Sequence, residues 1–160
     1  MSFLIIFLSL IVLLFLAAYF TKRRFGVLGL ALATGALLSS LWVGDLTPLI
    51  AQAGIVLIKP PLQSVVSAVL ILLPALLLLS SGPSYKSQLQ RIVGAGAFAV
   101  LAIALLLEPL GSALVIDKVG QPVYDFFVAN RIVIITICLG LAIVDLFMTK
   151  TPKHHAKEAH

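Results

Sequence analysis

The chain has 160 residues, of which 61% are apolar and only 11% charged, with a formal net charge of +5. Soluble domains carry about 25% charged residues, so this composition excludes a soluble domain and indicates a membrane protein. The cations are spread in small groups between apolar runs, which argues against nucleic-acid binding. The single cysteine, Cys138, has no partner for an internal disulfide or a Cys-ligated metal site.

Five apolar segments follow one another along the chain, and each is predicted to be a transmembrane helix. Each has about 16 to 19 residues, a helical length of roughly 24 to 29 Å that matches the hydrocarbon layer. In lipid the backbone groups of a single span must pair within that span, which a helix allows. The sequence therefore predicts an all-α polytopic membrane protein. The predicted spans are residues 2–20, 26–43, 64–80, 92–107 and 132–148, which together make one domain over 1–148.

A basic triplet, Lys22, Arg23 and Arg24, follows the first segment. A secretory signal carries its positive charge before the apolar core, so the first segment is expected to remain in the protein. Lysine and arginine concentrate in cytoplasmic loops, which predicts the N-terminus outside and the C-terminus in the cytoplasm. The loop with Arg91 and the polar tail over 149–160 then also face the cytoplasm.

The two outer connections are too apolar for solvated loops. Residues 46–58 are expected to form a short helix that begins at Pro48 and either lies in the interface or dips into it as a re-entrant element. The connection over 108–131 is broken by prolines and glycines and predicts two further short interfacial helices. These would be separate from the five spans.

Small residues recur in the second and fourth segments, namely Gly29, Ala33, Gly35, Gly94 and Gly96. A spacing of four places small residues on one helix face, where they allow close approach between helices. We interpret these positions as packing sites. The pattern leaves open whether the packing is within one chain or between chains.

Pro74 and Asp145 are the residues that suggest an ion pathway. Pro74 interrupts the third segment, and transporters use broken helices to build ion sites, although a packing kink is the simpler interpretation. Asp145 is the only acidic residue inside a predicted span, which makes it a speculative ion or proton site. Its position near the cytoplasmic boundary favours instead a carboxylate that either reaches the inner interface or pairs with a lysine.

No motif predicts an enzyme or a cofactor. The sequence has no Walker pattern, no dinucleotide-binding glycine pattern, no HExxH and no Gly-x-Ser-x-Gly. The histidines lie in the polar tail, where we expect a mobile segment rather than a metal site; they are His154, His155 and His160.

The stretches KRRFGVLGLALATGALLSSLWV and QLQRIVGAGAFAVLAIALLLEPL resemble the colicin V production protein (CvpA-like) family of small bacterial inner-membrane proteins. The resemblance covers about residues 1 to 130 and depends on Arg24, Phe25 and Gly26 and on Arg91 and Gly94. Phe25 and Gly26 stand in the reverse of the family's order, and the fifth span is additional. The resemblance implies a non-enzymatic inner-membrane protein with a role in export or envelope homeostasis.

These observations predict a protein that acts by assembly in the cell envelope. Its partners are expected to be membrane lipid and either further copies of itself or another membrane protein. One alternative is a small oligomeric channel or transporter with Pro74 and Asp145 near a conduction path. Another is a membrane anchor subunit whose basic tail recruits a soluble partner.

Overall fold

The computed structural model describes residues 3–55, 57, 60–80, 85, 87–114 and 116–148. These residues form five α-helices, all long and apolar enough to cross a membrane, and contain no strand. The all-α fold with five membrane-spanning helices is therefore confirmed, and the chain is a multi-pass integral membrane protein. The helices are α1 (Phe3–Thr21), α2 (Phe25–Gln52), α3 (Leu62–Ser80), α4 (Gln88–Ala113) and α5 (Gln121–Phe147). The predicted tail over 149–160 lies outside the described residues.

Three of the helices are longer than predicted, because the outer segments continue the spans. α2 runs through Pro48 to Gln52, α4 runs through Pro109, and α5 begins at Gln121. The separate interfacial helices expected over 46–58 and 108–131 are thus corrected: residues 46–52 belong to α2, 108–113 to α4 and 121–131 to α5, and the described residues between these helices are not helical. A proline in a membrane helix removes one backbone bond without ending the helix when neighbouring groups compensate. At 28, 26 and 27 residues these helices are about 40 Å long and extend beyond the hydrocarbon layer.

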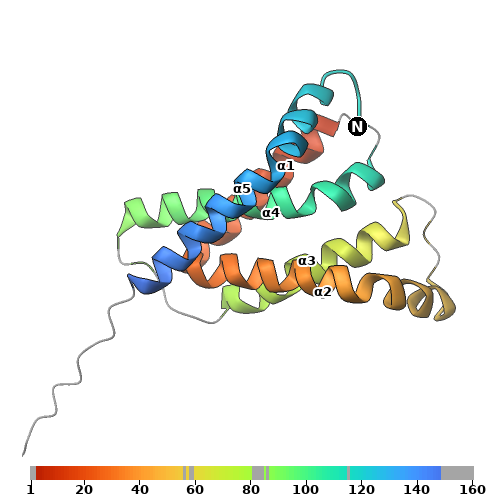
Figure 1. Cartoon of the computed structure of the whole chain (residues 1–160), viewed down its shortest axis with the longest axis horizontal. Coiled ribbons are helices and arrows are strands. Elements are labelled where there is room, and N and C mark those ends of the chain that lie inside the picture. The colour runs from red at the N-terminus through yellow and green to blue at the C-terminus, as the bar shows by residue number, and fades with distance from the viewer. Residues whose placement is uncertain are drawn as a thin grey trace, which may run out of the picture.

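α4 is the central helix of the bundle (Figure 1). Every residue from 101 to 107 is buried, and α4 contacts each of the other four helices. α2 and α3 form the most extensively packed pair, and Figure 1 shows them side by side below α4. In contrast, α5 buries only Cys138 and Ala142, so most of its apolar surface is exposed on the outside of the bundle.

α5 crosses the bundle diagonally. At its beginning, Tyr124 and Phe127 form edge-to-face ring contacts with Phe3 and Phe7 of α1. At its other end, α5 packs against the beginning of α2, where Gly26 lies beside α5 (Figure 1). α5 therefore contacts α1 near its beginning and α2 near its end, and it also packs against α4.

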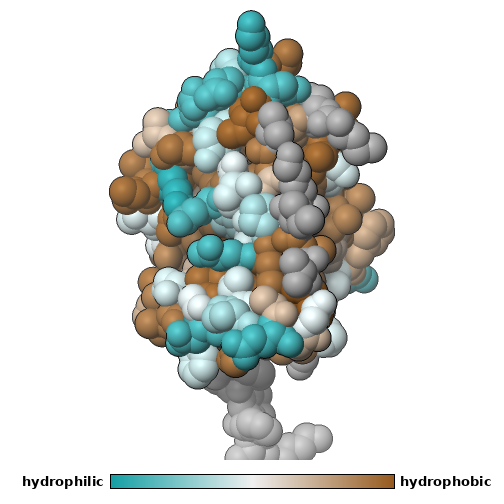
Figure 2. Space-filling model, turned by 90° about the vertical axis from the view of Figure 1, so that its right-hand side faces the viewer, coloured by the Kyte–Doolittle hydropathy of each residue, from teal (hydrophilic) through white to brown (hydrophobic). Residues whose placement is uncertain are grey.

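The two ends of the bundle differ. We call one the basic end: it holds the α1–α2 turn, the α3–α4 connection and the end of α5, together with Lys22, Arg23, Arg24 and Arg91. We call the other the distal end: it holds the beginning of α1 and the α2–α3 and α4–α5 connections. Figure 2 views the distal end, where hydrophilic residues run across the centre of the face and apolar residues flank them.

Candidate functional site

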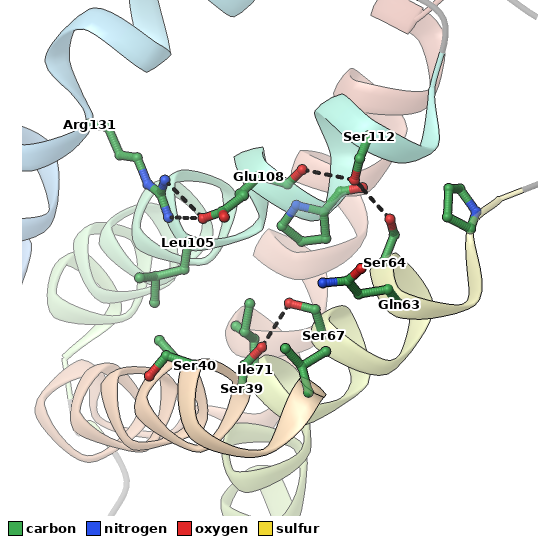
Figure 3. Close-up of a pocket in the computed structure, with 14 residues that line it drawn as sticks. Ser39, Ser40, Gln63, Ser64, Ser67, Ile71, Leu105, Glu108, Ser112 and Arg131 are labelled. Carbon is green, nitrogen blue, oxygen red and sulfur yellow. Dashed lines mark hydrogen bonds and ion pairs between the residues drawn. The ribbon is translucent and has the colours of Figure 1, made fainter. Parts of the chain in front are cut away.

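A cavity of about 560 Å³ lies between α2, α3, α4 and α5 (Figure 3). Much of its wall is made of uncharged polar side chains, although it is enclosed by apolar membrane helices. A ligand pocket of this volume is in the usual range for small molecules. The uncharged polar residues of the wall are Ser39, Ser40, Gln63, Ser64, Ser67 and Ser112.

The diagonal course of α5 makes room for this cavity. Gly26 and Gly29 let α5 come close to α2 near the basic end, because a Cβ at either glycine would lie 3.0 Å or less from an atom of Ala142. Towards the distal end α5 moves instead against α4, where Gly111 meets Tyr124. The space that α5 leaves beside α2 and α3 is the serine-lined cavity.

The cavity reaches deep into the membrane layer. Ser39 lies 14 residues beyond Phe25, or about 21 Å along α2 from the basic end. Ile71, at the cavity floor, lies nine residues before Ser80, or about 14 Å along α3 from the same end. With a hydrocarbon layer about 30 Å thick, the cavity spans from mid-membrane to the distal surface.

Two pairs of serines hold the cavity wall together across helices (Figure 3). Ser39 of α2 and Ser67 of α3 are 2.7 Å apart, and Ser64 of α3 and Ser112 of α4 are 2.8 Å apart. Ser112 also lies 3.1 Å from the carbonyl oxygens of Glu108 and Pro109, either of which can accept its proton in place of Ser64. In the Ser39–Ser67 pair only one of the two hydroxyl protons is used, because each hydroxyl has one proton and two acceptor positions. The other proton can be donated to a ligand.

Pro109 adds a backbone acceptor to the wall. It lies inside α4 and has no N–H, so the carbonyl of Leu105, four residues earlier, has no helical donor. Both residues line the cavity. The helix therefore lacks one regular backbone hydrogen bond beside the cavity.

One ion pair lies on the cavity wall. The two terminal nitrogens of Arg131, Nη1 and Nη2, are each 3.3 Å from Oε2 of Glu108. The Glu108 side chain is 77% exposed and that of Arg131 34% exposed, so the pair lies where the cavity reaches the surface. The two charges cancel, and the cavity carries no net charge.

The basic residues singled out from the sequence lie at the basic end, where Arg23 and Arg91 cap helices. Arg23 donates from Nε and Nη2 to the last carbonyls of α3, at Leu79 and Ser80. Arg91 donates to the carbonyl of Tyr19 near the end of α1 and lies over the Tyr19 ring. Cations at helix C-termini are favourable because the free carbonyls there carry partial negative charge.

Asp145 also lies at the basic end and does not reach the cavity. Its Oδ2 accepts the N–H of Gly26 at 2.9 Å, and its Oδ1 is 3.9 Å from Nη2 of Arg24. The carboxylate thus caps the N-terminus of α2, where negative charge is favoured. Asp145 and Pro74 both lie outside the cavity wall, so the structure does not unite the two residues from which an ion path was suggested.

Tyr85 completes the basic end. Its backbone N–H donates to the carbonyl of Lys22, which has a positive φ of 58°, and its hydroxyl accepts the N–H of Phe25 at 3.0 Å. Burial raises the pKa of the Tyr85 phenol above its ordinary value of 10.0, the Phe25 N–H lowers it, and nearby Asp145 raises it. The phenol is therefore a neutral hydrogen-bonding group at ordinary pH.

The small residues fall into different environments. Gly35 lies against the backbone of α3, and Gly94 against the ring of Tyr85. Gly29 lies against α5, whereas Ala33 of α2 is partly exposed. A Cβ at Gly96 would meet no atom within 4 Å. The first three positions are packed within the chain, and Gly96 faces open space.

The sequence did not reveal that the serines of the cavity wall lie together, because they come from three helices. Ser39 and Ser40 interrupt an apolar run, and Ser64 and Ser67 share one helix face at a spacing of three. These local signals were available, but hydroxyls also occur on lipid-facing sides, as Thr34 and Thr136 do here with bonds to their own helices. Only the packing of α3 between α2 and α4 shows that the serines meet.

No family of proteins, no curated protein and no solved structure that was compared with the chain matches it. The resemblance to the colicin V production family remains an expectation from the sequence. Among the described residues, no group of three or more His, Cys, Asp or Glu side chains is placed to hold a metal ion.

Proposed function

We infer that the protein is a non-catalytic membrane protein that takes a polar ligand into the serine-lined cavity from one side of the membrane, as transporters and channels do. The observation that carries this proposal is the polar wall in the half of the membrane layer nearer the distal end, where Ser39 lies about 21 Å along α2 from the basic end. Polar groups inside a membrane bundle are expensive and mark the paths and sites of substrates. Here the wall also has a spare hydroxyl proton in the Ser39–Ser67 pair.

The charge distribution supports an orientation for this site. Lys22, Arg23, Arg24 and Arg91 gather at one end of the bundle, and cations favour the cytoplasmic side. With the basic end inside a bacterial cell, the N-terminus is outside and the C-terminus is in the cytoplasm. The cavity then opens to the outer side of the inner membrane.

Cysteine labelling tests the proposal. In a Cys138→Ala background, Ser39→Cys places a thiol in the cavity, and Thr34→Cys places one on the exposed side of the same helix. In sealed vesicles, a membrane-impermeant polar maleimide is expected to label Ser39→Cys from the outer side only. Thr34→Cys faces lipid and should stay unlabelled. If Ser39→Cys reacts from neither side, the cavity is closed to water and the proposal fails.

Assembly in the cell envelope, with a role in export or envelope homeostasis, is the second candidate. It is favoured by the course of α5, which buries only Cys138 and Ala142 and leaves the rest of its surface for lipid or a neighbouring protein. Native mass spectrometry in mild detergent tests it. A stable homo-oligomer, weakened by Ile137→Lys on the exposed side of α5, supports assembly. A strictly monomeric species without a partner argues against it.

A further inference from the structure

The serine-lined cavity reaches the surface beside the lipid-facing sides of two helices. Ser40 of α2 and Arg131 of α5 both line it. Exposed apolar side chains lie within one turn of them, at Leu37 and Leu41 on α2 and at Ile132 on α5. A ligand at this mouth therefore meets polar groups on its inner side and apolar side chains on its outer side. That combination fits an amphiphile better than a wholly polar solute.

The Glu108–Arg131 ion pair at the mouth of the cavity indicates which charge a suitable ligand carries. Both terminal nitrogens of Arg131 bond the same oxygen of Glu108, so Oε1 of Glu108 has no hydrogen bond within the described part of the chain. Arginine has five N–H donors, of which this pair uses two. The pair thus retains donors for a phosphate oxygen and an acceptor for an ammonium group. A ligand with a single net charge would meet one of the two residues as a like charge.

The inner wall is uncharged and offers single hydrogen bonds. The Ser39–Ser67 pair has one unused proton. This proton suits an ester oxygen of a neutral backbone such as the glycerol of a phospholipid. The inner wall provides no charge that would hold an ion.

We propose that the cavity takes the zwitterionic phosphoethanolamine headgroup of a membrane phospholipid, which enters between α2 and α5 while its acyl chains stay in the membrane. The phosphate contacts Arg131, and the primary ammonium donates to Oε1 of Glu108. The acyl chains lie against Leu37, Leu41 and Ile132. This inference rests on the proposed function, because it names the ligand of the same cavity.

Protection from labelling tests the inference. The full chain with Cys138→Ala and Ser39→Cys is placed in nanodiscs of phosphatidylglycerol, with or without phosphatidylethanolamine, and treated with a neutral water-soluble maleimide. The labelling rate at Ser39→Cys is divided by the labelling rate of a second variant, Gln121→Cys, whose exposed thiol also lies at the distal end. This ratio removes any effect of the lipid composition on the reagent itself. Phosphatidylethanolamine is expected to slow the relative rate by about tenfold, the effect of one charge-assisted hydrogen bond. Glu108→Gln should abolish the protection, whereas Thr136→Val on the lipid-facing side of α5 should leave it unchanged.

The possible outcomes distinguish a failure of the lipid inference from a failure of the proposed function. Equal labelling in both lipid compositions overturns the lipid inference and leaves the proposed function standing. No labelling in either composition overturns the proposed function and the inference together. Protection by free glycerophosphoethanolamine at the same total concentration would show a soluble ligand, which also overturns entry from the membrane.

Discussion

Gly35 of α2 lies so close to the carbonyl oxygen of Ile71 in α3 that a Cβ at this position would overlap it. The same Cβ would be 2.7 Å from the carbonyl oxygen of Leu70. Leu70 is four residues before Pro74, so its carbonyl has no helical donor. The closest approach between α2 and α3 therefore occurs where the proline opens the α3 backbone, and weak Cα–H contacts to the carbonyls are favoured there.

Gly35→Ala should destabilise the protein because the added methyl group must push α3 away from α2. Overpacking of this kind costs about 1 to 3 kcal/mol. Thermal unfolding in a fixed detergent measures the effect. Gly96→Ala is the matched control, since a Cβ there meets nothing within 4 Å and alanine is the better helix former. Equal effects of the two substitutions would contradict the close contact at Gly35.

Asp145→Ala should also destabilise the protein, since it leaves the N–H of Gly26 without its acceptor and Arg24 without its nearby carboxylate. The expected loss is about 1 to 3 kcal/mol, and Asp145→Asn should recover part of it because an amide oxygen still accepts the N–H. Asp125→Asn on the exposed beginning of α5 should change stability by less than about 0.5 kcal/mol. If Asp145→Ala unfolds at the wild-type temperature, the carboxylate does not cap α2.

Tyr85 should make the protein sensitive to alkaline pH. Its phenol has a raised pKa in the folded protein, so the unfolded chain loses the phenol proton first as the pH rises. The stability that Tyr85 contributes is present below pH 10.0 and is lost as the pH rises through the folded pKa. The difference in phenolate absorbance between wild type and Tyr85→Phe isolates this titration from those of the other two tyrosines. A midpoint at or below 10.0 contradicts the prediction.

The hydroxyl pair between Ser39 and Ser67 should stabilise the α2–α3 contact. A double-mutant cycle with Ser39→Ala and Ser67→Ala is expected to give a coupling of about 0.6 kcal/mol, the usual value for hydrogen bonds between membrane helices. Unfolding in detergent of the wild type, the two single variants and the double variant provides the measurement. Pairing Ser39→Ala with Ser80→Ala is the control, because Ser80 bonds its own helix at the basic end. A coupling no larger than in the control would mean that the two hydroxyls do not meet.

Helix boundaries show where sequence reasoning fails in this chain. The sequence predicted that helices stop or restart at Pro48 and Pro109, whereas both prolines lie inside continuous helices. Proline is a strong stop signal because it removes one backbone hydrogen bond. The other backbone bonds of α2 and α4 continue on both sides of the proline, so each helix passes through it.

The sequence alone determined that the chain has five spans with a basic turn between the first two. The hydropathy of a segment is a local property, and each span must satisfy the hydrogen bonds of its own backbone. Which end of the bundle faces the cytoplasm is also a sequence prediction, and the labelling experiment tests it. The partner of Asp145, the contact at Gly35 and the serine-lined cavity were decided only by the tertiary structure. Ser39 and Ser112 lie 73 positions apart in the chain. The course of α5 across α4, which depends on packing along whole helices, leaves open the space that these serines border.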